Sequence, residues 1–519
     1  MDNLFISKSS IAKSKILVSK ILVRYFQFFL MHQDYQNRNL FDQDFQKPVF
    51  VRTNTDAYAK RKIDEHEKNN NSILNNNELE TLKINWLTIS QDEYRLKDVS
   101  LLSKIHITGR AQFVATGCVF TSLNGKTPAL EIFANSSAVF DKCVFKNCNG
   151  VSVIVRDRSM AQFNNCTFLS NKDSIFSFDR SYIECNNCVF SQSTHSSITV
   201  DKSASAKISD SKFKESQGKA ISVKAGSKIH VYDSLFDSNK DGSIVLIEKS
   251  FGCFSRNTFQ KIVATAICAT KESHVYSKFN TFEEIAGNAI AFVNSTGFSY
   301  NDKIKGTKAP AIAVKGKMAN PVISNTVISY TNNYAVACRE ASCPTFDQCT
   351  FEKIGSNVFS ISEGSYPKIK NSLFKNIDLV ENVIFSVFEY ARPILINNEI
   401  HINNNKISQT IPPLVSSFYG GNPQIHENNG FSKLQINTRN DGTFNYVCED
   451  YSSADEFENL YETCHVQDFY SDLEPFKPPM VNGQKLRFYT PPNDREVPRL
   501  PDFETPSDIC LPLKTYQFT

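Results

Sequence analysis

A short phrase recurs along the middle of the chain: a small polar residue, then any residue, then a large apolar residue that we call the anchor. Successive anchors lie 22 to 26 residues apart, and 23 is the commonest spacing. Regular spacing of this kind indicates a repeat protein with one structural unit in each interval. The thirteen anchors are Phe120, Phe145, Phe168, Phe190, Phe213, Phe236, Phe259, Phe282, Ile304, Val327, Phe351, Phe374 and Ile400.

Apolar residues also alternate with polar ones at fixed offsets from the anchors. Alternation with a period of two is typical of short strands, and the Ser, Gly, Asn and Asp residues between such stretches are typical of turns. Eight and ten residues after an anchor stand the pairs Val153 with Val155, Phe176 with Phe178, Ile198 with Val200, Ile221 with Val223, Ile244 with Leu246, Ile290 with Phe292, Ile312 with Val314, and Phe359 with Ile361. Seven and five residues before an anchor stand pairs such as Ala161 with Phe163, Ala206 with Ile208, and Ile229 with Val231.

Three short strands in each unit of about 23 residues predict an all-β fold, a right-handed parallel β-helix of about 13 coils over residues 105–420. Each coil would pair with the next at ~4.8 Å, and parallel crossovers are nearly always right-handed. Leucine-rich repeats, left-handed β-helices and propellers need spacings that are missing here. We expect the Phe anchors from Phe145 to Phe282 to form one continuous buried stack.

These repeated units resemble the right-handed parallel β-helix repeat proteins of the pectate-lyase-like superfamily. The resemblance rests on the recurring anchor phrase and covers residues 105–420, about three-fifths of the chain. It implies the fold. It does not select a function, because that fold serves lyases, glycosidases, epimerases, surface adhesins and non-catalytic scaffolds.

Three further segments flank the predicted β-helix. Residues 1–56 hold a basic amphipathic stretch at 8–31, which we expect to dock on the chain as a helix, with peripheral contact to an anionic membrane as the alternative. Residues 57–104 read as a charged linker and N-terminal cap, in which Ser90-Gln91-Asp92-Glu93 has the capping-box form that begins a helix. Residues 421–519 form an acidic, Pro-rich tail that is either irregular or an extended strap.

The net charge and the search for targeting segments limit the kinds of partner that we expect. The net charge is +3, so nothing in the overall balance points to nucleic acid, and we expect a monomer. Residues 431–519 carry 8 Lys and Arg against 15 Asp and Glu, whereas the rest of the chain carries 49 against 39. No apolar run has the length of a membrane-spanning helix, and no clear signal peptide begins the sequence.

The cysteines favour a cytoplasmic location. Cys118, Cys143, Cys166 and Cys188 occupy the same place in four consecutive coils, where later coils mostly have Ser or Asn. We interpret this column as a stacked polar ladder of reduced thiols, hydroxyls and amides. Cys185 with Cys188 makes a Cys-x-x-Cys pair, a weak metal or redox signal without a second pair.

One cluster of charges carries the candidate chemistry. Asp210, Asp233 and Arg256 stand three residues before successive anchors. In lyases of the superfamily that the chain resembles, stacked carboxylates hold calcium and an acidic sugar, and a basic residue acts as base. The alternative is a solvated charge ladder in which Arg256 offsets Asp233. No cofactor is expected, and calcium only under the lyase interpretation.

Two functions from different classes remain open at this point. The leading hypothesis is a non-catalytic solenoid that presents a binding or scaffold surface to a protein or a glycan. The alternative is a carbohydrate-active enzyme, a lyase or hydrolase of acidic polysaccharide. The motif sets of pectin-type glycosidases and the Asp-Pro-His signature of alginate epimerases are absent, which favours the first hypothesis. A groove lined by Asp210, Asp233 and a basic residue opposite them would favour the second.

Overall fold

The computed structural model describes residues 81–90, 93–122, 127–377, 379, 383–401, 413–426, 428, 436–439, 445–447, 480–481 and 484–485. The amphipathic segment 8–31 and most of the acidic tail lie outside the described residues, so the expectations for them stay predictions. Within the described part of the chain, no helix has the length and apolar character needed to cross a membrane.

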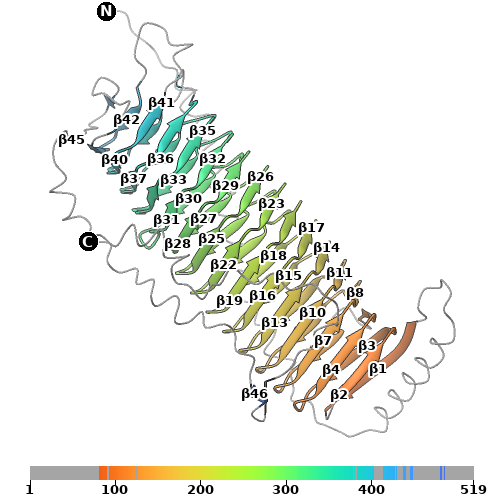
Figure 1. Cartoon of the computed structure of the whole chain (residues 1–519). Helices are drawn as coiled ribbons and strands as arrows, with labels where there is room; N and C mark the ends of the chain where they lie inside the picture. Colours follow the sequence, from red (N-terminus) through yellow and green to blue (C-terminus); the bar gives the residue numbers. More distant parts are fainter. Residues whose placement is uncertain are drawn as a thin grey trace, which may run out of the picture. The chain divides into compact units, whose positions relative to one another are not determined.

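The described strands stack as the successive coils of a parallel solenoid (Figure 1). In one coil β15 (Ser196–Val200), β16 (Ser205–Ser209) and β17 (Lys212–Lys214) pair in parallel with β18 (Lys219–Val223), β19 (Lys228–Tyr232) and β20 (Leu235–Asp237) of the next. The first and third strands of the coils belong to one sheet of 29 strands, sheet A, and the second strands form a sheet of 16, sheet B. The predicted all-β parallel solenoid of about 13 turns is confirmed.

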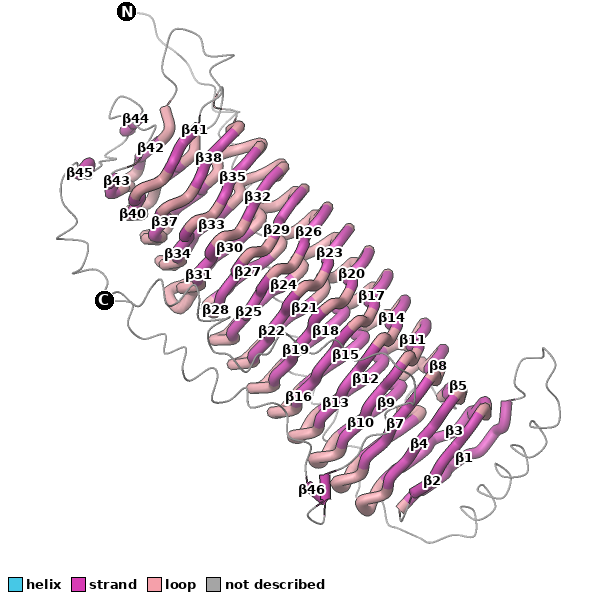
Figure 2. The backbone as a smooth tube through the Cα atoms, viewed as in Figure 1, coloured by secondary structure: helices cyan, strands magenta, loops and turns pink. Residues whose placement is uncertain are grey.

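The tube in Figure 2 shows the three strand types in their order around each coil. The other first strands are β6 (Leu130–Ile132), β9 (Val151–Val155), β12 (Asp173–Ser177), β21 (Ile244–Leu246), β24 (Ile267–Thr270), β27 (Ile290–Val293), β30 (Ile312–Lys315), β33 (Val336–Arg339), β36 (Phe359–Ile361), β39 (Phe385–Val387), β42 (Val415–Phe418) and β44 (Ile436–Arg439). The other second strands are β2 (Glu93–Lys97), β4 (Gln112–Thr116), β7 (Ser137–Asp141), β10 (Met160–Asn164), β13 (Tyr182–Asn186), β22 (Phe251–Ser255), β25 (His274–Lys278), β28 (Thr296–Tyr300), β31 (Val322–Ser324), β34 (Thr345–Asp347), β37 (Lys368–Lys370), β40 (Ile394–Ile396), β43 (Gln424–His426) and β45 (Asn445–Val447). The other third strands are β5 (Val119–Thr121), β8 (Val144–Lys146), β11 (Thr167–Leu169), β14 (Val189–Ser191), β23 (Thr258–Gln260), β26 (Thr281–Glu283), β29 (Lys303–Lys305), β32 (Val327–Ser329), β35 (Thr350–Glu352), β38 (Leu373–Lys375) and β41 (Glu399–His401).

The predicted phenylalanine stack forms the centre of the core. From Phe145 to Phe282 the seven rings are fully buried, and neighbouring ring centroids lie 4.6 to 4.8 Å apart in stacked geometry. Each ring fills the space above the same ring of the coil before it, so one residue type satisfies every layer. The nine Ser residues that precede anchors by nine positions are buried as well: Ser136, Ser159, Ser181, Ser227, Ser250, Ser273, Ser295, Ser342 and Ser365.

Three register predictions were wrong because some coils lose or gain a residue in a turn. The core strand residues after Phe168 are Ile175 and Ser177, which pair with Val153 and Val155. Phe176 and Phe178 therefore lie on the outer face, half-buried. The anchor predicted at Val327 is Ile328, which pairs with Ile304 and Phe351, while Val327 is 36% exposed.

The predicted helix at Ser90 was also wrong. Two long strands, β1 (Thr81–Ile89) and β3 (Ser100–Ile107), pair in parallel, and β2 begins at Glu93, where the capping box would place the first turn of a helix. The buried side chains of Leu96, Val99 and Leu101 belong to these first coils rather than to a cap above them. Tertiary pairing outweighs a four-residue helix signal. Paired strands extend to β45, and β46 (Met480–Val481) with β47 (Gln484–Lys485) forms an antiparallel pair in the tail.

The predicted polar ladder lies at the turn between the second and third strands. The backbone N–H of each ladder residue donates to the side chain of the ladder residue one coil later. This holds from Cys188 to Ser211 (3.1 Å), Ser211 to Ser234 (3.1 Å), Ser234 to Asn257 (3.0 Å), Asn257 to Asn280 (2.8 Å) and Asn280 to Asp302 (2.7 Å). The buried backbone groups of the turn are satisfied in this way. All eleven described cysteines are free thiols.

Candidate functional site

Asp210, Asp233 and Arg256 occupy one turn position in three successive coils. Each has a left-handed backbone, with φ of 51°, 52° and 54°. Asn and Asp adopt this conformation more readily than most residues, and the same position holds Asn165 and Asn187 in the two coils before. Local backbone geometry therefore accounts for the carboxylates without a ligand.

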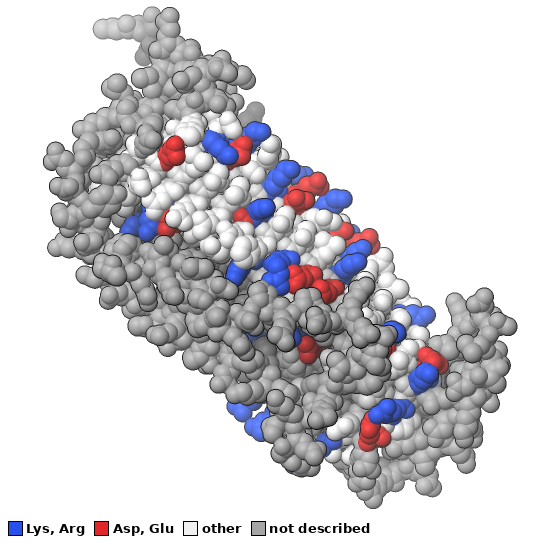
Figure 3. Space-filling model, in the orientation of Figure 1, with Lys and Arg blue, Asp and Glu red and all other residues white. Residues whose placement is uncertain are grey.

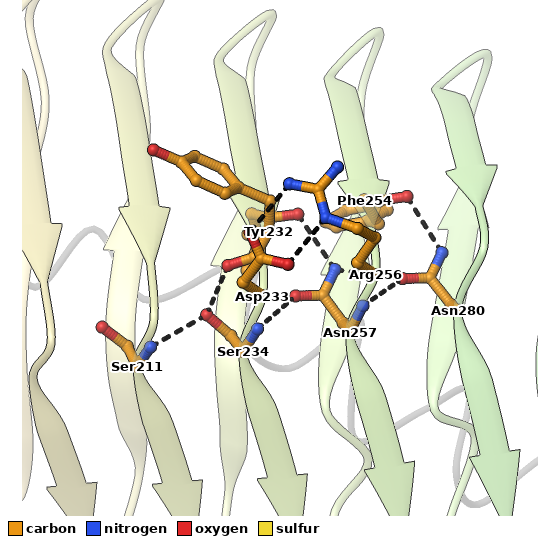
Figure 4. A network of polar contacts seen from close by, with 9 residues as sticks. Ser211, Tyr232, Asp233, Ser234, Phe254, Arg256, Asn257 and Asn280 are labelled. Atoms are coloured by element: carbon orange, nitrogen blue, oxygen red, sulfur yellow. Dashed lines mark hydrogen bonds and ion pairs between the residues drawn. The ribbon is translucent and has the colours of Figure 1, made fainter. Parts of the chain in front are cut away.

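Arg256 neutralises Asp233 directly (Figure 4). Its Nε and Nη2 donate to the two carboxylate oxygens, both at 2.7 Å, and both side chains are about one-third exposed. Burial and the nearby Asp233 raise the pKa of Asp210, and the hydrogen bond to Asp233 raises the pKa of Arg256. The lyase interpretation needs a basic group across a groove from the carboxylates, but Arg256 stands on the same column as they do. The three residues form a charge ladder.

The described residues contain no group of three or more His, Cys, Asp or Glu side chains that could hold a metal ion.

A histidine–carboxylate pair on another face was missed by sequence reasoning. His195 Nδ1 lies 2.7 Å from Asp173 Oδ1, and the His195 side chain is 46% exposed. Asp173 begins β12 and His195 immediately precedes β15, so the two residues are one coil apart in space but 22 residues apart in sequence. The outward rings of Phe176 and Phe178 stand on the same coil as Asp173, 5.1 Å from each other. A search for partners at the coil spacing would have found the pair.

A second cluster that sequence reasoning missed lies in the N-terminal coils, and its charged side chains pair with one another. Glu131 accepts from Arg156 Nε at 2.9 Å and lies 3.2 Å from His106 Nε2, and both Glu131 and His106 are almost fully buried. Burial, followed by the charges of Lys104 and Arg156, lowers the pKa of His106 to about 3. His106 is therefore neutral near pH 7. With its charges paired internally, the cluster stabilises the outer face of β3, β6 and β9 rather than offering a site.

A further distinctive surface of the described coils is an uncharged band along the outer face of the first strands. The outward residues at its centre, which we call the floor, are Val245, Cys268, Ala291, Ala313, Ala337, Ser360 and Ser386, one in each of β21, β24, β27, β30, β33, β36 and β39. Figure 3 shows this face as an uncharged strip between two rows of charged side chains. Beside the floor stand Thr265, Asn288, Pro310, Tyr334 and Asn357, all partly exposed.

Several of the charges along one border of the band are paired with one another. Along the turn after the first strands, Lys271 pairs with Glu248 at 3.0 Å and Lys249 with Glu272 at 3.5 Å. Two coils further on, Lys315 pairs with Glu340 at 2.9 Å. The band has a sequence signal too, because residues 262–270, 285–301, 318–338 and 354–362 contain no Lys, Arg, Asp or Glu.

The family model described as right-handed beta helix region matches residues 74–236, 151–304 and 265–430, which together span most of the chain. The chain belongs to the right-handed β-helix family. Membership confirms the handedness expected for the coils and the resemblance drawn from the anchors. The β-helix family match begins at residue 74 and so also includes the early strands that sequence reasoning assigned to a cap.

Solved β-helix structures resemble the chain at low identity. The periplasmic alginate epimerase AlgG is 10% identical, over 71% of this chain and 78% of its own, with a TM-score of 0.32. A mannuronic acid specific polysaccharide family 6 lyase from human gut microbiota is 12% identical, over 74% and 95%, with a TM-score of 0.30. A tailspike protein double mutant of E. coli bacteriophage HK620 in complex with pentasaccharide is 10% identical, over 75% and 74%, with a TM-score of 0.29. Likenesses this weak carry no functional argument. No curated protein matches the chain.

Proposed function

We propose that this β-helix is a non-catalytic binding scaffold that docks a protein partner on its uncharged band. The observation that supports the proposal is the floor of seven small or apolar side chains in seven consecutive coils, bordered on one side by three lysine–glutamate ion pairs. An uncharged centre with a polar rim is the anatomy of protein–protein interfaces.

The chemistry of the floor favours a protein over a glycan or a nucleic acid. A bound sugar needs hydrogen-bond partners for its hydroxyl groups, and burying a hydroxyl without one costs ~1–3 kcal/mol. Val245, Ala291 and Ala313 offer none, and the backbone groups of these strands are engaged by the strands on either side. Phosphates require unpaired cations, whereas Lys249, Lys271 and Lys315 face carboxylates.

The proposal is tested by affinity purification from the native cells with a single charge placed on the floor. The bait proteins are the full chain, its Ala313→Arg variant, and a Thr281→Arg variant in which the new charge lies on the outer face of β26, away from the floor. A partner retained by the full chain and by Thr281→Arg, but lost by Ala313→Arg, is the expected result. Equal recovery of all partners by the three bait proteins would contradict the band as the binding face.

The second candidate, a carbohydrate-active enzyme, is favoured by one observation, the His195–Asp173 pair beside outward aromatic rings. An imidazole oriented by a carboxylate is an arrangement that general acid–base catalysis uses. Neutral polysaccharides and polyuronates, with and without calcium, provide the screen. Activity lost in His195→Ala and kept in His401→Ala would establish this candidate, because His401 makes an equivalent exposed pair with Glu399 at 2.6 Å.

A further inference from the structure

We infer that the uncharged band pairs with the same band of a second copy of this chain. The inference rests on the proposed function, since it takes the band as a binding face and names its partner. It replaces the monomer expected from the sequence.

The band has the layered chemistry of a subunit interface. Ala291 and Ala337 on the floor are only 5% and 6% exposed although they point outward. Val293 and Tyr334 stand beside the floor and are partly exposed, and in the two coils after Val293 its column continues with the exposed residues Lys315 and Arg339. A second surface laid on the band would therefore meet uncharged side chains over the floor and the charged groups of Lys315 and Arg339 along one edge.

The extent of the band matches what a stable pair needs. Seven strands at ~4.8 Å give a length of ~34 Å, and six residues at ~3.3 Å give a width of ~20 Å. The product is ~700 Å² for each copy, or ~1,400 Å² in total, within the ~1,200–2,000 Å² of specific interfaces.

The regularity of the band favours a second copy over an unrelated partner. Two faces of identical strand spacing interdigitate along their whole length, and small floor residues let two sheets pack ~10 Å apart. A two-fold axis brings the same surface to both sides, so an uncharged strip meets an uncharged strip. Along one border Glu248, Glu272 and Glu340 are each paired with a lysine, which weakens the attraction of these groups for a charged macromolecule.

The test is sedimentation velocity of the full chain over a range of concentrations. The expected species has twice the 58.6 kDa chain mass. Ala313→Arg is expected to weaken the association at least about tenfold, because a charge buried without a partner at an interface costs several kcal/mol. Thr281→Arg is expected to leave it unchanged. Val293→Arg, at a partly exposed position beside the floor, repeats the test should Ala313→Arg fail to fold.

Each outcome decides something. The inference is overturned if the full chain stays monomeric at ~100 μM, because this concentration is well above the dissociation constant of a typical specific interface of this size. A dimer that Ala313→Arg and Val293→Arg both leave intact overturns it as well, because the contact then lies elsewhere. The third outcome is a full chain that is monomeric but binds a partner of different mass, which the Ala313→Arg variant no longer binds. This result would contradict self-association and would leave the proposed function supported.

Discussion

Some positions have the same structural role in every coil, and the anchor is the clearest example. A phenylalanine ring at the anchor has an identical ring on both sides, so each ring contributes to two contacts at once. The residue three positions before the anchor must instead adopt a left-handed backbone conformation in a tight turn. That requirement places Asp210 and Asp233 where a lyase site was suspected, and it is satisfied equally by Asn165 and Asn187.

Truncating one ring of the stack is expected to be costly. Phe213→Ala should lower the free energy of unfolding by ~3–5 kcal/mol, because it leaves a cavity between two rings that cannot close. Phe279→Ala removes the same atoms from a ring that is 45% exposed, and should change stability by less than ~1 kcal/mol. Urea unfolding followed by circular dichroism compares the two. Equal losses would mean that the anchors do not carry the core.

The buried thiols are expected to be unreactive in the folded chain. Burial raises the pKa of Cys253 to about 12 and that of Cys349 to about 12, so almost no thiolate is present at pH 8. Of the fourteen cysteines, eleven are described, and ten of those are buried. An aromatic disulfide reagent should therefore modify no more than four thiols before urea is added and most of the fourteen afterwards. Three or more disulfides in the unfolded protein would refute the reduced ladder.

At the scale of elements, the ladder shows which features of a coil the sequence reveals. Hydroxyl, thiol and amide alternate there because each accepts the same backbone N–H, so the column was recognisable from Cys, Ser and Asn at one offset. The lengths of the turns were harder to predict from the sequence. The coil after Phe168 is one residue short before β12, and the coil after Ile304 is long by one, so fixed offsets placed Phe178 inside and missed Ile328.

One described ladder residue, Asp302, is a carboxylic acid, and its titration leads to a pH-dependent prediction. Asp302 is fully buried at the end of this run of the ladder, where it accepts from Asn280 and Ser299, and burial raises its pKa to about 6. Below about pH 3 the group is protonated in both folded and unfolded chains, and its burial costs no stability. Between pH 4 and pH 6 the unfolded chain releases the proton first, so stability falls by up to ~3 kcal/mol as pH rises.

Asp302→Asn removes that titration while keeping an acceptor for the Asn280 N–H, as Asn257 and Asn280 do in neighbouring coils. The variant should match the parent chain near pH 4 and exceed its stability by up to ~3 kcal/mol at pH 7. Urea midpoints at the two pH values measure the difference. A variant that is destabilised by the same amount at both would show that the carboxylate is not strained by its burial.

At the scale of the whole molecule, the sequence predicted the architecture far better than the site. Thirteen anchors were enough for the solenoid because every coil repeats one packing problem. The first coils were missed because β1 and β3 lack the anchor phrase, and a capping-box tetrad suggested a helix instead. The His195–Asp173 pair was missed because it exists only between coils, across a spacing that a search for local motifs does not cover. The band was missed because its charge-free stretches become one surface only when successive coils stack.

The uncharged band is the face on which we propose that this β-helix binds. Site-specific photo-crosslinking tests it most directly, with a benzophenone amino acid replacing Ala313 on the floor or Thr281 on β26 of the full chain in its native cells. The account predicts a discrete crosslinked product from position 313, either twice the chain mass or joined to one other protein, and none from position 281. No product from position 313, or equal products from both positions, would contradict it.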